Sequence, residues 1–294
     1  IIVYIFRFFN SFFYDLIRFV KYSNIEYEEF RDSDKLVSKI ISLYHPIEKG
    51  LSLENPRTGF GKPRIEMLTK CISIYSSRFP KHQWNIQVES GLWVLKEYLD
   101  FNKKRGCEIP NLENFLAEYS DILTNDNPKG GTRLFKIDQS FFDENISFED
   151  LVSLRSSIRN FGNEKINTSD VDRALKLAQA SPSTCNRQST RILRTSEREI
   201  IDELLLLQNG ANGFSSGISC LLIVCSDLAC YQGEGDRYSG VVDGSLFGMT
   251  LIHALTRFKI ASVPLNWSKN YLHDIKLRKI INIPASYNVL FFIG

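Results

Sequence analysis

A stretch of the second half of the chain, FEDLVSLRSSIRNF (residues 148–161), carries two arginines four positions apart. They are Arg155 and Arg159, and Ser156 and Ser157 lie beside them. The apolar spacing of the stretch predicts a helix, on which residues four apart share one face. A guanidinium offers a rigid fork of donors to phosphate oxygens, so the pattern predicts a phosphate site. A solvated basic helix end is the alternative.

A second polar stretch, ASPSTCNRQSTR (residues 180–191), follows the helix-like SDVDRALKLAQ. Pro182 ends that helix and forces Ser181 into an extended backbone. Hydroxyl and amide side chains follow at Ser183, Thr184, Asn186 and Gln188. Such groups can bind the edge of a heteroaromatic ring and a polyol chain without ionising. A polar loop that caps itself is the alternative.

Other catalytic and metal-binding patterns do not occur in the sequence. It has no G-x-S-x-G, no H-E-x-x-H and no G-x-G-x-x-G after a strand. The six cysteines form no C-x-x-C pair; they are Cys71, Cys107, Cys185, Cys220, Cys225 and Cys230. We therefore expect free thiols in a reducing compartment, no metal site, and no side chain acting as a catalytic nucleophile.

The composition is that of an ordinary globular protein. The 294 residues are 43% hydrophobic and 24% charged, and the net charge is +2. A charge so close to zero gives no broad positive field, so we expect no nucleic-acid partner. The length suits one large domain or two modest ones.

The pattern of elements changes along the chain. Residues 1–125 have helical periodicity and predict no strand, so we expect a helical N-terminal extension. The Pro- and Gly-rich TNDNPKGGTR predicts a linker over 126–145. Residues 146–294 alternate helices with widely spaced strands, which predicts an α+β domain whose sheet is sandwiched by helices.

Residues 1–22 are strongly apolar but are interrupted by Arg7, Asp15 and Arg18, which argues against a membrane-spanning helix. On a helical wheel the polar side chains fall on one side. Such a helix either lies at a membrane surface or packs on its own protein. No secretion signal is evident, so we expect a cytoplasmic protein, with peripheral membrane association left open.

The two polar stretches together resemble the paired signature of the nitroreductase family, an Arg-x-Ser-x-Arg-x-Phe motif followed by a Pro-Ser-x-x-Asn loop. LLIVCSDL, VDGSLFGMTLIHAL and IASVPLNW continue the resemblance in the family's order, over residues 148–294. The resemblance implies an α-β-α sandwich, bound FMN, NAD(P)H as electron donor and a small-molecule acceptor. It also implies a homodimer with FMN at the interface.

Position by position, the resemblance implies that Arg155 and Ser157 hold the FMN phosphate, with Ser156 beside them. Arg159 would lie near the pyrimidine edge of the flavin, where positive charge favours the anionic reduced ring.

The polar loop and a later strand complete the implied site. Ser183, Asn186 and Gln188 would contact the flavin, and Ser183 is placed to reach the cofactor of a partner subunit. The segment Pro264, Leu265 and Asn266 would lie near flavin N5. Asp243, Gly244 and Gly248 match the long helix that packs the family's dimer, which gives them a structural role.

The chain departs from the family in two places. Ser189 and Thr190 stand where Pro-Trp is common, which puts the rigidity of the loop in doubt. The family's basic C-terminal segment would follow Gly294, so we expect the domain to be truncated at its C-terminus. These departures keep open a non-catalytic dimeric or membrane-surface protein of polysaccharide biosynthesis, and a flavoenzyme of different chemistry such as dehalogenation.

A distinctive run in the first half, YHPIEKGLSLENPRTGFGKPR (residues 44–64), resembles a segment of nitroreductase-like proteins with a helical extension. Its glycines and basic residues predict a flexible loop, which either clasps an anion or bridges two helices and covers the flavin edge.

Overall fold

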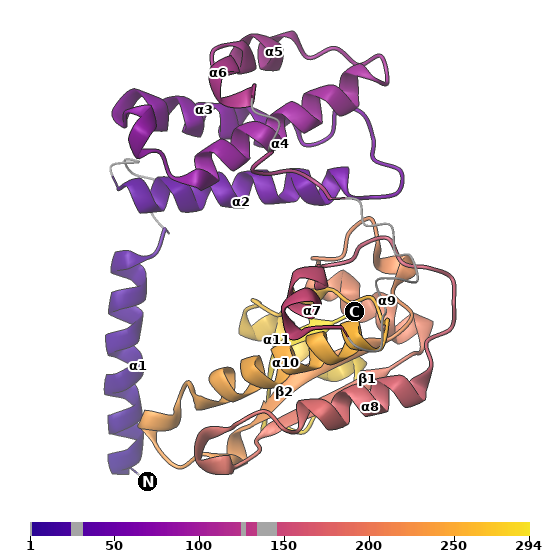
Figure 1. Ribbon diagram of the computed structural model, residues 1–294. Helices are drawn as coiled ribbons and strands as arrows, with labels where there is room; N and C mark the ends of the chain where they lie inside the picture. Colours follow the sequence, from indigo (N-terminus) through magenta and orange to yellow (C-terminus); the bar gives the residue numbers. More distant parts are fainter. Residues whose placement is uncertain (1, 25–31, 125–127, 134–145) are drawn as a thin grey trace. The chain divides into compact units, whose positions relative to one another are not determined.

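The computed structural model describes residues 2–24, 32–124, 128–133 and 146–294. The chain divides into two compact units, residues 12–135 and residues 136–294 together with 1–11, so that the division falls inside the first helix. Most of the expected linker, 126–145, lies outside the described residues. Each unit is described by itself (Figure 1).

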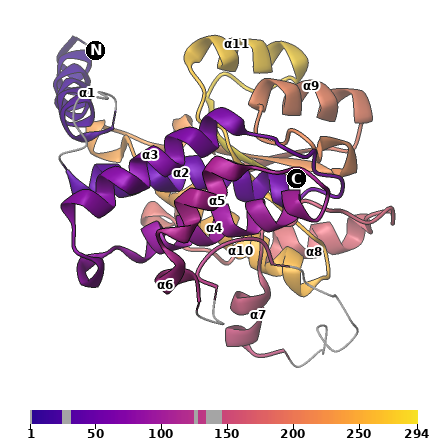
Figure 2. The ribbon, with the colours of Figure 1, turned by 90° about the horizontal axis from the view of Figure 1, so that it is seen from above.

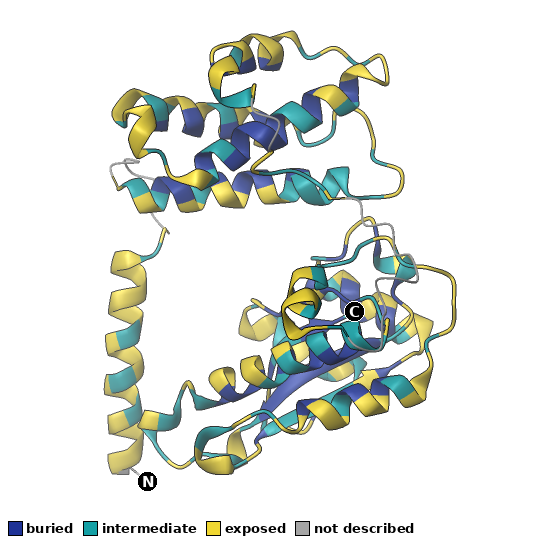
Figure 3. Cartoon of the chain, viewed as in Figure 1, coloured by how far each residue is buried: buried dark blue, intermediate teal, exposed yellow. Residues whose placement is uncertain are grey.

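The helical unit consists of α2 (Ser33–Leu51), α3 (Lys62–Arg78), α4 (Ile86–Lys103), α5 (Pro110–Ala117) and α6 (Ser120–Leu123). Asp32 starts α2 by accepting hydrogen bonds from the amides of Asp34 and Lys35. The core is formed where α2 packs against both α3 and α4, and Gly91 of α4 lets Ile40 of α2 approach closely. Figure 3 shows this buried centre in α4.

The run 44–64 is helical in part, which corrects the expected loop. α2 continues through Pro46 to Leu51, because the buried Ile47 holds its last turns against the core. The remaining segment bridges α2 and α3 and is tied down by Phe60. The Phe60 ring lies so close to Gly50 that it would collide with any side chain there. The backbone carbonyl of Phe60 accepts a hydrogen bond from Tyr98 Oη at 2.6 Å. The structural alternative therefore describes this bridge better than an anion clasp.

The second unit is an α+β domain, as the sequence predicted. Its helices are α7 (Phe148–Leu154), α8 (Thr168–Ala178), α9 (Arg198–Gln208), α10 (Ser239–Arg257) and α11 (Tyr271–Ile280). Its strands are β1 (Thr190–Thr195), β2 (Leu221–Asp227), β3 (Pro264–Asn266) and β4 (Tyr287–Ile293). They form one antiparallel sheet in the order β1-β2-β4-β3, with an irregularity in β2 between Val224 and Cys225.

Helices cover both faces of this sheet. α8 and α10 pack together on one face, and α9 and α11 lie together on the other (Figure 2). β2 is buried almost throughout, as expected for a central strand with two covered faces. Gly244 and Gly248 let α10 approach β4, since a Cβ at either would lie 2.2 Å from a side-chain atom of Leu290 or Phe291.

The N-terminal helix α1 (Ile2–Tyr22) has no buried side chain among residues 3–22 (Figure 3). Within the described ranges, no helix has both the length and the apolar character needed to cross a membrane.

Candidate functional site

The first predicted cluster is not helical, which corrects the expectation for residues 155–161. α7 ends at Leu154, and Arg155 has a non-helical backbone with ψ 117°. The reason is tertiary: the Ile158 amide donates to the Ser262 carbonyl at 3.1 Å. Arg155 and Arg159 therefore do not share a helix face, and an extended segment runs instead beside the residues that lead into β3.

This segment brings the first cluster next to the predicted Pro264–Asn266 segment. β3 is an edge strand. On its outer side, the carbonyl of Ser262, just before the strand, accepts from the Ile158 amide, and the Asn266 carbonyl accepts from Gln208 Nε2 at 2.9 Å. Pro264 and Asn266 are exposed, whereas the side chain of Leu265 is buried in the core.

Arg155 lies close to His253 of α10. Burial lowers the pKa of His253, and the positive charge of Arg155 lowers it further. The Nδ1 atom of His253 is buried and has no hydrogen-bond partner among the described residues. A bound anion would balance the positive charge of Arg155 beside this unpartnered ring nitrogen.

The donors of the first cluster are available to a ligand. Within the described ranges, neither the Arg155 guanidinium nor the hydroxyls of Ser156 and Ser157 hydrogen-bond to protein, and all three residues are half-buried. Arg159 is half-buried too, and its Nη1 atom lies 3.5 Å from the Ser157 carbonyl. The donor set of one guanidinium and two hydroxyls suits a phosphate group.

The second cluster, residues 183–188, is a tight loop with a left-handed backbone at three non-glycine residues, Cys185, Asn186 and Gln188. The Gln188 amide donates to Ser183 Oγ at 2.9 Å, and Gln188 Nε2 donates to Asn186 Oδ1 at 3.2 Å. The polar groups of the loop therefore bond partly to one another, as the alternative of a self-capping loop predicted. Among the described residues, the Ser183 hydroxyl proton and the side-chain NH2 group of Asn186 have no acceptor. Both donors suit the carbonyl oxygens of a heteroaromatic ring.

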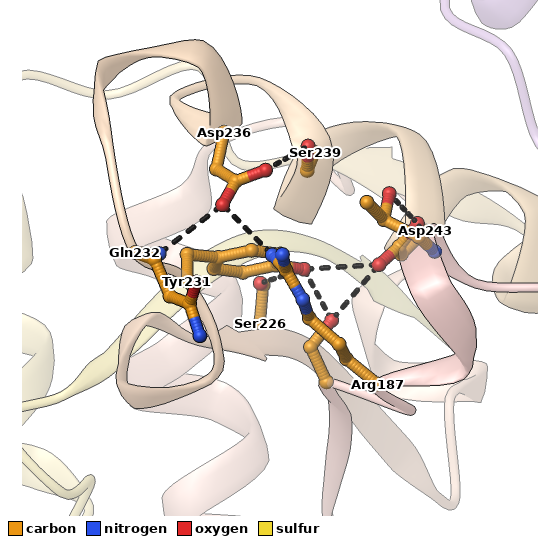
Figure 4. A network of polar contacts seen from close by, with 9 residues as sticks. Arg187, Ser226, Tyr231, Gln232, Asp236, Ser239 and Asp243 are labelled. Atoms are coloured by element: carbon orange, nitrogen blue, oxygen red, sulfur yellow. Dashed lines mark hydrogen bonds and ion pairs between the residues drawn. The ribbon is translucent and has the colours of Figure 1, made fainter.

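A buried carboxylate fixes this loop. Asp243 of α10 is 2% exposed, and its Oδ1 atom accepts from the amide and the hydroxyl of Thr184, both at 2.9 Å. Its Oδ2 atom accepts from Tyr231 Oη at 3.1 Å and from Ser189 Oγ at 3.3 Å (Figure 4). Ser189 is fully buried, and its bond to Asp243 anchors the end of the loop.

A second anchor, Arg187, was missed at the sequence level. Its Nη1 atom donates to Asp236 Oδ2 at 2.8 Å, and the Gln232 amide donates to the same oxygen at 3.1 Å (Figure 4). The bond from Arg187 lowers the pKa of Asp236, and the bond to Asp236 raises the pKa of Arg187. The sequence gives no indication that Arg187 pairs with Asp236, because the two residues are 49 positions apart.

The two clusters lie beside the same helix, α10, but at different positions along it. The loop 183–188 is attached beside Asp243, whereas Arg155 lies beside His253, ten residues further along α10. That spacing is about 15 Å of helix. In the part of the chain that the structure describes, the side chains of Arg155, Ser156 and Ser157 make no hydrogen bond to this loop. The α10 face between them exposes Val242, Leu246 and Met249.

Part of the chain is similar to a known family. Residues 152–213, which contain both clusters, match the model of the nitroreductase family. No curated protein matches the chain.

Several solved nitroreductase-family structures are similar to the α+β unit. An FMN-dependent nitroreductase of Clostridium difficile is 16% identical, with a TM-score of 0.43 over 49% of this chain and 83% of that one. A nitroreductase of Desulfitobacterium hafniense with bound FMN is 20% identical, with a TM-score of 0.40 over 49% and 85%. An NADPH:FMN oxidoreductase of Vibrio harveyi in complex with NAD+ is 16% identical, with a TM-score of 0.43 over 49% and 66%.

Among the described residues, no group of three or more histidine, cysteine or acidic side chains is placed to hold a metal ion. All six cysteines are free thiols, and burial raises the pKa of Cys225 to about 12.

Proposed function

We propose that the protein is an FMN-dependent oxidoreductase that takes electrons from NAD(P)H and passes them to a small-molecule acceptor. The proposal is supported by the family of residues 152–213 and by the free donors of Arg155, Ser156 and Ser157 beside the edge of β3. The position of these donors is the observation that carries it.

The phosphate of FMN would be held by Arg155 and the two hydroxyls. A dianion there would neutralise the positive charge beside His253 and would give its unpartnered ring nitrogen a better electrostatic environment. Each such charge-assisted hydrogen bond contributes about 1.5–3 kcal/mol. The FMN phosphate would thus bind where the positive charge of Arg155 is not balanced by an acidic side chain among the described residues.

The isoalloxazine would lie against the outer edge of β3, near Pro264 and Asn266. When bound, FMN would supply the hydride-transfer chemistry between the nicotinamide and the acceptor. The protein would orient the ring, and Arg159 would provide positive charge at the edge of the ring that is anionic when reduced. No side chain needs to act as a nucleophile or as a general acid.

The site would be completed by a second copy of the chain. The donors of Ser183 and Asn186 are at the Asp243 end of α10, and Arg155 is at the His253 end. If two copies of α10 cross in antiparallel orientation about a twofold axis near Leu246, the clusters of different protomers meet. The exposed apolar face of α10 would be buried in this contact.

The absorption spectrum of the purified protein tests the proposal. We expect the visible absorption bands of oxidised flavin, in the protein as isolated or after adding FMN. NAD(P)H should bleach them. Arg155→Ala should weaken FMN binding by about 10- to 100-fold, the range expected for a lost charge-assisted contact. Arg173→Ala, an exposed arginine that pairs with Asp170, is the matched control and should leave FMN binding unchanged. Absence of flavin binding would exclude the proposal and favour the non-catalytic alternative.

A further inference from the structure

The N-terminal helix α1 carries a large exposed apolar surface that the proposed function does not use. Side chains near its middle and both ends are more than half exposed, among them Ile5 at 62%, Leu16 at 55% and Phe19 at 64%. Exposed apolar area of this extent is costly in water, and on soluble proteins it marks an interaction surface.

The side chains of α1 separate into two arcs. At 100° per residue, the apolar arc spans about 160° of the helix circumference. Its members are large aliphatic and aromatic residues: Ile5, Phe6, Phe9, Phe12, Phe13, Leu16, Ile17, Phe19 and Val20. The opposite arc contains the polar side chains, with Val3 as the aliphatic exception: Arg7, Asn10, Ser11, Tyr14, Asp15, Arg18 and Lys21.

The polar arc is cationic and includes tyrosines. Arg7, Arg18 and Lys21 stand against a single carboxylate, Asp15, so its charge is positive. The Arg18 guanidinium lies 5.4 Å from the ring centre of Tyr14, and Lys21 Nζ lies 5.1 Å from that of Tyr22. Tyrosine with lysine or arginine is the combination found at the headgroup level of membranes, and the positive charge complements anionic lipid.

We propose that α1 lies in the plane of an anionic lipid surface, with its apolar arc in the acyl region and its cationic arc among the headgroups. Arg7, Asp15 and Arg18 interrupt the apolar sequence, and α1 is not apolar enough to cross a bilayer. A second copy of α1 is a poorer match, because a two-helix seam covers a narrower stripe and would leave the flanks of the arc in water. The surface binding does not depend on the flavin site.

Flotation of the purified chain with vesicles tests this proposal. We expect binding to vesicles of phosphatidylcholine mixed with phosphatidylglycerol, and much weaker binding to phosphatidylcholine alone or at high salt. The double variant Ile5→Gln, Leu16→Gln removes apolar contact without changing charge and should weaken binding at least tenfold. The matched control Asn10→Gln, Ser11→Gln on the polar arc should bind as the parent does.

The charge contribution is tested separately by Arg18→Gln, Lys21→Gln. This variant should bind mixed vesicles about tenfold or more weakly and phosphatidylcholine vesicles unchanged. Circular dichroism should show that every variant keeps its helix content. Failure to bind mixed vesicles, or equal binding to both compositions, would overturn the proposal. So would a dimer in sedimentation analysis that Ile5→Gln, Leu16→Gln dissociates while vesicle binding is unchanged. The flavin spectrum reports on the other site and should be the same in all these variants.

Discussion

Thr184 is bound twice by Asp243: its amide and its hydroxyl both donate to the same carboxylate oxygen, at 2.9 Å each. One residue of a long helix therefore holds the polar loop that the sequence singled out as a ligand site. The other carboxylate oxygen serves Tyr231 and Ser189. Burial raises the pKa of the Tyr231 hydroxyl, which therefore stays protonated and able to donate to Asp243.

Asp243→Asn should loosen the loop and destabilise the domain. An asparagine at this position has one acceptor oxygen, so it cannot serve both pairs of donors that the carboxylate accepts. We expect the free energy of unfolding to fall by about 1–3 kcal/mol, measured by urea denaturation. Asp172→Asn, an exposed partner of Arg194, should change it by less than about 0.5 kcal/mol. Equal effects of the two substitutions would mean that the buried network does not hold the loop.

The titration of His253 should report on Arg155. Burial and then Arg155 lower the pKa of His253 below its ordinary value of 6.5. As the pH falls below 6.5, the unfolded chain takes up a proton at this residue before the folded chain does, so this contribution makes the protein less stable in acid. We expect Arg155→Ala to raise the pKa of His253, and bound phosphate or FMN to raise it in the parent. NMR of the ring proton measures it, with His253→Gln for assignment.

If the pKa of His253 is the same in the parent and in Arg155→Ala, Arg155 does not lie where the structure places it.

The exposed face of α10 should be required for dimer formation. Leu246 is 44% exposed and lies on α10 between Asp243 and His253. Leu246→Glu should convert a dimer into a monomer, since a carboxylate would be buried at the axis without a partner. It should also weaken FMN binding, although it does not contact the cofactor. Leu206→Glu on α9 is the control, because Leu206 is 78% exposed on the other side of the sheet. Light scattering measures the mass, and a Leu246→Glu dimer would contradict the pairing.

Local pattern predicted most of the elements but not the shape of the first cluster. The helical periodicity expected for residues 1–125 is confirmed in the described part of that region, which contains the helices α1 to α6 and no β-strand. Residues 155–161 also have helical spacing, yet the bond from Ile158 to Ser262 straightens them, and those residues are more than a hundred positions apart. The end of α2 was not predicted, because a proline such as Pro46 usually ends a helix. Here burial of Ile47 stabilises the turns that follow it.

The residue types of the candidate site were predictable, but its supports were not. The donors of Arg155, Ser183 and Asn186 were visible as unusual polar runs. The bonds from the loop to the two aspartates, from Thr184 and Ser189 to Asp243 and from Arg187 to Asp236, join positions 49 to 59 residues apart. A single sequence carries no signal for such pairs. The separation of the two clusters along α10 is likewise a tertiary property.

The central claim, that each FMN site combines Arg155 of one protomer with the loop 183–188 of its partner, is tested most directly by mixed dimers. Arg155→Ala and Asn186→Gly chains, carrying different tags, would be co-expressed and the heterodimer purified. Glycine suits the left-handed backbone of Asn186, so this variant removes only the amide. One site of the heterodimer then holds both substitutions and the other holds neither. The account predicts one FMN per heterodimer bound with the affinity of the parent protein; two equally weakened sites would contradict it.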